Sequence, residues 1–212
     1  MKKIAILVVF ILFAVAASLN AQNPALSVPK FKGIEITGTV DQFGAKLSGQ
    51  GFTFLSKEDY GSVYMGRFAG ISDCFVYLVP VVNSNDIASI TVMIGLKPSD
   101  YEVFSYETWE DLLGNYEFLK DLLTEKYGKP TEENEGFSKE AYTANSHLKL
   151  SAVKDGQCEY FAQWGDSDID KMVVRLDISG IKNLGREYAV ITLQYRNVDK
   201  MKEYKKGVLD DL

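Results

Sequence analysis

Two stretches of the chain share one pattern: GISDCFVYLVP at residues 70–80 and KDGQCEYFAQW at residues 154–164. In each stretch, turn-forming residues precede a cysteine, and a run rich in aromatic and β-branched side chains follows it. Such runs predict strands, and the turn-forming residues before them predict hairpins. The matching positions of Cys74 and Cys158 indicate that one structural unit occurs twice in the chain.

The first unit is expected over residues 30–97. A short helix comes first, capped by Thr39 or Asp41, because a side-chain oxygen at either position can accept a hydrogen bond from a free backbone amide. Four strand-like runs follow, at residues 52–56, 62–69, 74–82 and 87–96. Short runs separated by turn-forming clusters predict an antiparallel meander. Pro80 predicts a sheet edge or a bulge near the end of the third run.

The second unit is expected over residues 105–198, and it begins with a helix after Thr108. One broad face of this helix is apolar, and it consists of Trp109, Leu112, Leu113, Tyr116, Leu119, Leu123 and Tyr127. Gly128 and Pro130 end the helix.

Beyond that helix the pattern again predicts strands. An acidic loop at residues 132–136 precedes strand-like runs at residues 137–144, 148–154, 158–164, 172–179 and 188–197. Residues 199–212 are expected to form a C-terminal helix or tail. The predicted fold class is therefore α+β, with two tandem units, each a helix packed on a roughly four-stranded antiparallel meander.

The first 21 residues predict a secretory signal peptide. Lys2 and Lys3 precede an apolar run at residues 4–17, and a small residue, Ala21, marks the expected cleavage point. The alternative is a retained membrane anchor, but a run of about 14 residues is shorter than the 20 or so that span a bilayer. We therefore expect a periplasmic or secreted protein with no integral membrane segment after cleavage near Ala21.

The net charge of the chain excludes one class of partner. The formal net charge is −6, and binding to phosphate backbones needs clustered Lys or Arg, so no nucleic-acid partner is expected.

The two cysteines leave two alternatives open. In an oxidising compartment Cys74 and Cys158 can form a disulfide. They can equally be two free thiols, since cysteine is also common as a small buried hydrophobe.

No catalytic or metal-binding group emerges from the motifs. His147 is the only histidine, and a surface position near a turn is expected for it, because no nucleophile motif accompanies it. The sequence DSDID at residues 166–170 begins like a calcium loop. However, Lys171 occupies the position where such a loop needs glycine, and Asp177 is shorter than the required Glu. We expect a polar hairpin turn there, no metal and no cofactor.

Several segments carry a resemblance to a known family. They are FKGIEITGTVDQFGAKL at residues 31–47, DLLTEKYGKP at 121–130, VITLQYRN at 190–197 and the terminal DDL. Together with the signal they resemble an uncharacterised family of small secreted bacterial proteins, to which no activity and no site residues are attached. The doubled helix-plus-meander pattern is also similar to the tandem arrangement of the beta-lactamase inhibitor protein family. That resemblance implies a long sheet whose concave face binds another protein.

The leading functional prediction is a non-catalytic binding protein whose partner is another envelope or extracellular protein. Its binding residues are expected to be exposed aromatic side chains on a sheet face, namely Tyr77, Tyr160 and Trp164, because Tyr and Trp are common binding anchors. The alternatives are a hydrolase that uses carboxylates and a cell-envelope assembly factor that accepts a partner strand at a sheet edge, such as one near Pro80.

Overall fold

The computed structural model describes residues 26–58, 60–95, 98–99, 102–103, 106, 108–183 and 186–210. The predicted signal peptide, with its cleavage point near Ala21, lies outside the described residues. The described part contains four α-helices and a set of antiparallel strands. The fold class is therefore α+β, as the sequence predicts.

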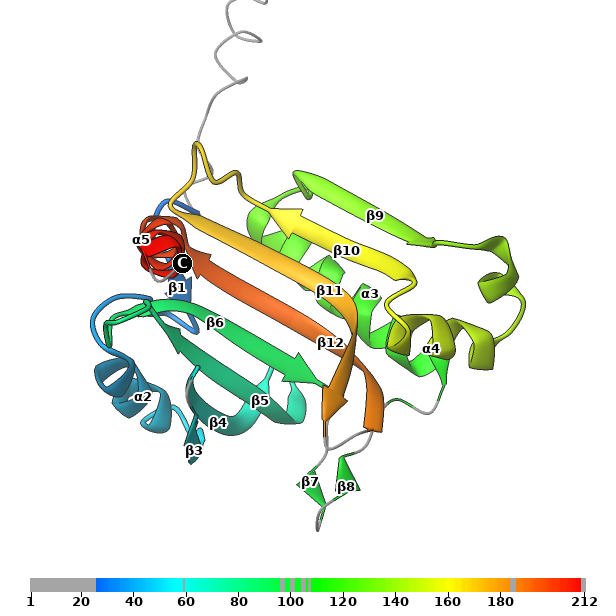
Figure 1. Ribbon diagram of the computed structural model, residues 1–212, viewed down its shortest axis with the longest axis horizontal. Coiled ribbons are helices and arrows are strands. Elements are labelled where there is room, and N and C mark those ends of the chain that lie inside the picture. The colour runs from blue at the N-terminus through cyan, green and yellow to red at the C-terminus, as the bar shows by residue number, and fades with distance from the viewer. Residues whose placement is uncertain are drawn as a thin grey trace, which may run out of the picture.

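One eight-stranded antiparallel sheet forms the body of the molecule (Figure 1). The order across the sheet is β3–β4–β5–β6–β12–β11–β10–β9. The strands are β3 (Thr53–Glu58), β4 (Gly61–Phe68), β5 (Ile71–Pro80), β6 (Ile87–Ile94), β9 (Glu132–Phe137), β10 (Cys158–Trp164), β11 (Met172–Asn183) and β12 (Arg186–Asn197). Two short pairs lie outside it, β1 (Lys30–Phe31) with β2 (Ile34–Glu35) and β7 (Pro98–Ser99) with β8 (Glu102–Val103).

The four predicted strands of the first half correspond to β3–β6. The second half contributes β9–β12, of which the sequence predicts β10, β11 and β12, and the two sets of strands meet where β6 pairs with β12. The register at this seam places Ile94 opposite Ile191 and Val92 opposite Leu193. All four side chains are fully buried, so the core continues across the seam without a break. That the two halves are copies of one unit stays a prediction.

Two helices begin at the caps that the sequence predicts. Thr39 precedes α2 (Val40–Ser48) and forms a capping box with Gln42, in which each side chain accepts a bond from the other's backbone amide. Thr108 precedes α3 (Trp109–Tyr127), and its hydroxyl accepts from the amide of Asp111 at 3.1 Å. Gly128 ends α3 with a positive φ of 82°, a conformation that glycine adopts without strain.

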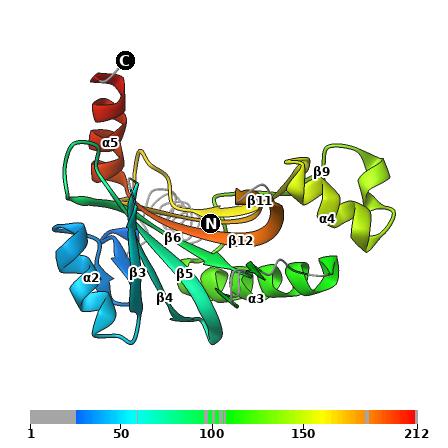
Figure 2. The same cartoon turned by 60° about the horizontal axis from the view of Figure 1, so that its bottom comes forward.

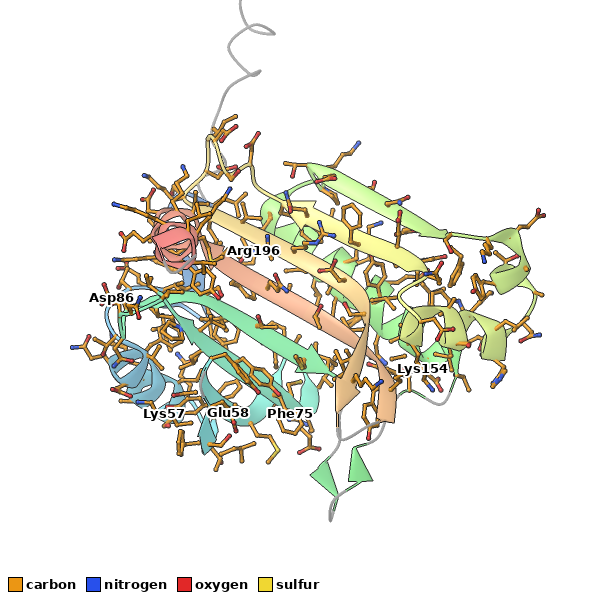
Figure 3. The ribbon with its side chains drawn as sticks, in the orientation of Figure 1. Lys57, Glu58, Phe75, Asp86, Lys154 and Arg196 are labelled. Carbon is orange, nitrogen blue, oxygen red and sulfur yellow. The ribbon has the colours of Figure 1, made fainter. Side chains whose placement is uncertain are left out.

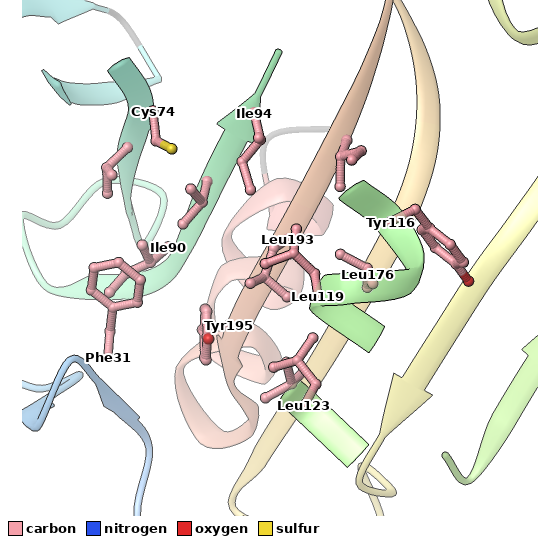
Figure 4. Close-up of a cluster of buried hydrophobic side chains, with 14 of the residues drawn as sticks. Phe31, Cys74, Ile90, Ile94, Tyr116, Leu119, Leu123, Leu176, Leu193 and Tyr195 are labelled. Atoms are coloured by element: carbon pink, nitrogen blue, oxygen red, sulfur yellow. The ribbon is translucent and has the colours of Figure 1, made fainter. Parts of the chain in front are cut away.

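Both of these helices lie on the same side of the sheet, whereas α5 (Val198–Asp210) rises on the opposite side at one end (Figure 2). The buried face of α3 is the predicted apolar stripe without Leu113, which is half-buried. Leu119 and Leu123 pack towards Leu193 of β12 (Figure 4). Burial of each such leucine contributes about 1.5–3 kcal/mol, so this layer holds the sheet and helices together.

Three predictions in the second half are wrong. Residues 137–144, expected as a strand, include only the last residue of β9, and they continue into a 3₁₀ turn, η2 (Glu140–Thr143). Residues 148–154, also expected as a strand, belong to α4 (Ser146–Lys154). Asn145 caps α4 by accepting from the amide of Leu148 at 3.0 Å, and Leu150 and Val153 are buried at helical spacing. The acidic segment expected as a loop is the edge strand β9, whose pairing with β10 runs from Glu132 to Phe137.

The first half differs from the prediction in smaller ways. Strand β5 starts at Ile71, so Cys74 lies inside a strand, whereas Cys158 opens β10. The register shifts between Val79 and Pro80, which confirms a bulge at the proline. An edge there is wrong, because β5 lies between β4 and β6.

Candidate binding surface on the open sheet face

The helices divide the sheet into a covered face and an open face. Helices α2 and α3 pack on the covered face, and no described helix crosses the strands on the other side, which faces the viewer in Figure 1. Side chains alternate between the two faces along each strand. The residues that alternate with the buried core therefore make up what we call the open face.

Trp164 belongs to the covered face, and the prediction that it is exposed is wrong. Its side chain is 0 % exposed. Its indole Nε1 donates a hydrogen bond of 2.9 Å to the carbonyl oxygen of Gly128, at the end of α3. The residue therefore anchors β10 to α3 inside the protein, and it is not available to a partner.

Tyr160 shares the covered face with Trp164, and it is half-buried beneath α3. Its ring lies 5.1 Å from that of Trp109, 5.5 Å from that of Phe137 and 6.2 Å from that of Tyr116. Its role is to fill the space between β10 and the helix. The prediction that Tyr160 is an exposed binding residue on the sheet is therefore wrong as well.

Tyr77 is the predicted residue that does lie on the open face. It is half-buried in β5, opposite Val63 on one side and Thr91 on the other. Its ring stacks on that of Tyr60 with centroids 6.2 Å apart. Burial raises the pKa of Tyr77, and Tyr60 and Glu58 add to the effect, so its hydroxyl stays protonated and able to donate.

The two cysteines are free thiols, Cys74 buried and Cys158 half-buried. Three strands separate β5 from β10, which amounts to about 19 Å at the usual strand spacing. A disulfide requires Cα atoms within about 7 Å. The structure therefore keeps the two cysteines apart as free thiols, and the alternative of a Cys74–Cys158 disulfide is not formed.

The half of the open face over β4–β6 and the adjoining end of β12 is apolar. Met65, Phe75 and Met93 lie side by side across β4, β5 and β6. Phe75 and Met93 also pack against Tyr188 and Val190 of β12, which they help to bury. This apolar half is a second hydrophobic cluster, separate from the core beneath the helices and partly open to solvent.

The other half of the open face, over β10–β12, is polar. Arg175 donates to the Asp177 carboxylate at 2.8 Å, and its guanidinium lies 3.9 Å from the centre of the Phe161 ring. Arg196, labelled in Figure 3 together with Phe75, donates from Nε to the amide oxygen of Gln194 at 3.0 Å. This polar half therefore offers guanidinium groups whose orientation is already fixed.

Burial changes the proton affinity of two groups in the polar half. It raises the pKa of Asp177, although Arg175 and Arg196 act in the opposite direction. Burial also lowers the pKa of Arg196, and repulsion by Arg175 adds to this effect. Both shifts mark a partly dehydrated surface, in which ionic contacts are stronger than in water.

A shallow hollow of about 490 Å³ lies at the edge of the polar half, and Glu159, Arg175 and Asp177 contribute to its walls. A glycoside hydrolase uses two opposed carboxyl groups, one of them a proton donor. Here the Asp177 carboxylate accepts a hydrogen bond from Arg175, and Glu159 is the other carboxylate of the hollow.

The remaining sequence candidates lie away from the open face or form turns. His147 is exposed, as predicted, but it lies in α4 instead of a turn. Asp166 and Asp168 form the expected polar turn, in which the amide of Asp168 donates to the Asp166 carboxylate at 2.8 Å. Among the described residues, no cluster of three or more His, Cys, Asp or Glu could hold a metal ion.

The sequence did not single out Arg175 and Arg196. The available signal was the alternation of Arg175 and Asp177 with Val174, Leu176 and Ile178 in β11, which places the charged pair on one face of a strand. That alternation does not reveal which face the helices leave open.

Comparison of the chain with known protein families, with curated proteins and with solved structures found no match. Within the described part of the chain, every helix is too short or too polar to cross a bilayer.

Proposed function

We propose that this protein is a non-catalytic binding protein that holds another protein against the open face of its sheet. The observation that supports the proposal is an eight-stranded sheet with α2 and α3 on one face only. Its other face combines half-exposed Phe75, Tyr77 and Met93 with the fixed guanidinium of Arg175. Aromatic residues, Met and Arg are the side chains enriched at protein–protein interfaces.

The breadth of the surface favours a macromolecular partner. The apolar and polar halves together extend over β4, β5, β6, β12, β11 and β10, whereas a small ligand occupies a single cleft or cavity of limited volume. We further propose that the partner is an envelope or extracellular protein, because the first 21 residues predict export. The sequence pattern resembles the tandem arrangement of the beta-lactamase inhibitor protein family, which binds through a sheet face, and that resemblance is consistent with a protein partner.

Site-specific photo-crosslinking tests the proposal. The crosslinking amino acid p-benzoylphenylalanine is introduced at Phe75 on the open face. The matched control position is Phe118, which is 48 % exposed on α3. After irradiation in the producing cells, we expect a covalent adduct at position 75 and none at position 118. A Tyr77→Arg variant carrying the crosslinker at position 75 should lose the adduct, because the new charge disrupts the apolar half.

A third crosslinker position distinguishes the envelope-assembly alternative. The edge strand β3 exposes Phe54 (51 %) and Leu55 (42 %), and an edge with free backbone groups can accept a partner strand. An adduct at Leu55 without one at Phe75 would contradict the open-face proposal and support strand addition. Equal adducts at Phe75 and Phe118 would also contradict it, since they would indicate random encounter.

A further inference from the structure

A separate hollow of about 350 Å³ lies where α5 meets the end of the sheet. Its walls come from β10–β12, from the loop after β10 and from one side of α5. Figure 3 shows Arg196 of β12 beside α5. The residues around the hollow are Gln163, Ser167, Val173, Arg196, Val198, Met201, Lys202, Tyr204 and Lys205.

The charges around this hollow are all positive. Arg196, Lys202 and Lys205 contribute to its walls, and no carboxylate does. None of these three cations lies within ion-pair distance of a described carboxylate, whereas Lys200 on the same helix pairs with Asp86 at 3.0 Å and with Glu203 at 2.8 Å. Three cations without a close ion pair around one hollow are unexpected in a chain whose net charge is −6.

The fold holds two of the cations in place. Lys202 donates to the carbonyl oxygen of Ser167 at 3.4 Å, across the hollow from its own helix. Arg196 is partly buried and bonded to Gln194, and burial together with repulsion by Arg175 lowers its pKa. An anion in the hollow would therefore meet two cations whose positions the fold restricts, Arg196 and Lys202, with Lys205 exposed beside them.

The floor of the hollow is apolar. Val173 and Val198 are buried, and Met201 and Tyr204 are half-buried beside them. A ligand that matches both features has an anionic head for the cations and a hydrocarbon body for the floor. Small-molecule sites usually measure about 300–1,000 Å³, so a hollow of about 350 Å³ suits a small ligand.

We propose that this hollow binds a small organic carboxylate with a flexible hydrocarbon body. The hollow shares Arg196 with the polar half of the open face, but Lys202, Lys205 and the floor residues of α5 lie outside the apolar half, so the two proposals are tested at different residues. The carboxylate lies between Arg196 and the two lysines of α5, and the apolar body covers Met201 and Tyr204.

Calorimetric titration of the full chain with decanoate tests this inference, with decanamide and decylamine as neutral and cationic probes of the same chain length. We expect saturable binding of decanoate at one site, weakened by salt, which screens exposed charges. Decanamide should bind at least about five times more weakly, since it lacks the interaction with partly exposed cations, and decylamine should not bind.

Matched lysine variants locate the site. Lys202→Gln and Lys205→Gln should each weaken decanoate binding about three- to fivefold. Lys206→Gln should leave the affinity unchanged, because Lys206 is an exposed neighbour on α5 that does not line the hollow. All three changes lie on the surface of one helix, so circular dichroism should show unaltered folding.

Three results would overturn the inference. They are the absence of saturable decanoate binding, equal affinity for decanoate and decanamide, and an equal loss of affinity in Lys205→Gln and Lys206→Gln. None of them bears on crosslinking at Phe75, so failure here and failure of the proposed function can be told apart.

Discussion

Burial keeps both thiols of the chain in their neutral form. Cys74 is fully buried in β5, and its thiol donates to the carbonyl oxygen of Ile71 at 3.4 Å. Burial raises the pKa of Cys74 and of Cys158 to about 11, from 9.0. Between those values the unfolded chain loses its thiol protons and the folded protein keeps them, so stability falls as the pH rises through this range.

We predict slow alkylation of both cysteines in the folded protein. The thiolate is the reactive form, and a pKa two units higher leaves about one hundredth as much of it near pH 8. Iodoacetamide labelling followed by mass spectrometry should therefore be about 100-fold slower in the folded protein than in denaturant. Single Cys74→Ala and Cys158→Ala variants assign the rates, and equal rates in the folded and unfolded chain would refute the prediction.

At the scale of single elements, Gly61 allows β4 and β5 to approach each other. Its φ is +140°, and a Cβ at this position would overlap the carbonyl oxygen of Leu78 in β5. The positive φ and the overlap with the Leu78 carbonyl oxygen are both features of the backbone, so no side-chain movement can relieve the strain of a larger residue. Gly136 in the edge strand β9 is the opposite case, since a Cβ there would meet nothing within 4 Å.

We predict that Gly61→Ala destabilises the protein by about 1–3 kcal/mol, the usual cost of a strained backbone residue. Gly136→Ala should change the free energy of unfolding by no more than about 0.5 kcal/mol, as is typical of an open surface site. Urea denaturation of the two variants beside the unsubstituted protein measures both effects. Equal unfolding midpoints for the two variants would contradict the prediction, because they would show that the space between β4 and β5 can accommodate a Cβ at position 61.

The elements that could be predicted are those with a strong local signal. Helix α3 has a cap at Thr108, a long apolar stripe and a terminal Gly128, and the strands around Cys74 and Cys158 are rich in aromatic and β-branched residues. Helix α4 was missed because its short sequence has little amphipathic character. Strand β9 was missed because its acidic residues gain strand conformation only from pairing with β10, which is a tertiary effect.

The candidate surface could be predicted only in part. Alternation correctly grouped Phe75 with Tyr77, and Tyr160 with Trp164, on shared faces of their strands. Which group remains open depends on where α2 and α3 pack, and that is decided by contacts between distant parts of the chain. For the same reason the grouping of Arg196 with two lysines of α5 could not be foreseen, because only the fold brings them together.

At the scale of the whole molecule, several contacts tie the two halves into one body. In addition to the β6–β12 seam, the side-chain amide of Asn197 donates to the carbonyl oxygen of Ile36 at 2.9 Å, and this bond is buried. The rings of Phe31 and Tyr195 pack edge to face, 5.2 Å apart. Because each of these contacts joins the first half to the last strand, neither half has a complete core of its own.

We predict that the protein unfolds in a single cooperative transition. Trp109 and Trp164 both lie in the second half, so tryptophan fluorescence reports on that half, whereas far-ultraviolet circular dichroism reports on all elements. The two urea denaturation curves should coincide, because loss of the seam exposes core residues of both halves. Separate midpoints for the two signals would show that the halves unfold independently.

The position of β12 in the sheet also affects how the chain folds during its synthesis. Strand β6 ends at Ile94, and its neighbour β12 begins only at Arg186. During synthesis, which delivers the N-terminal part first, the outer edge of β6 has no strand to pair with until most of the chain has left the ribosome. Prematurely terminated chains would keep that apolar edge unpaired, and they are therefore the species most prone to aggregate.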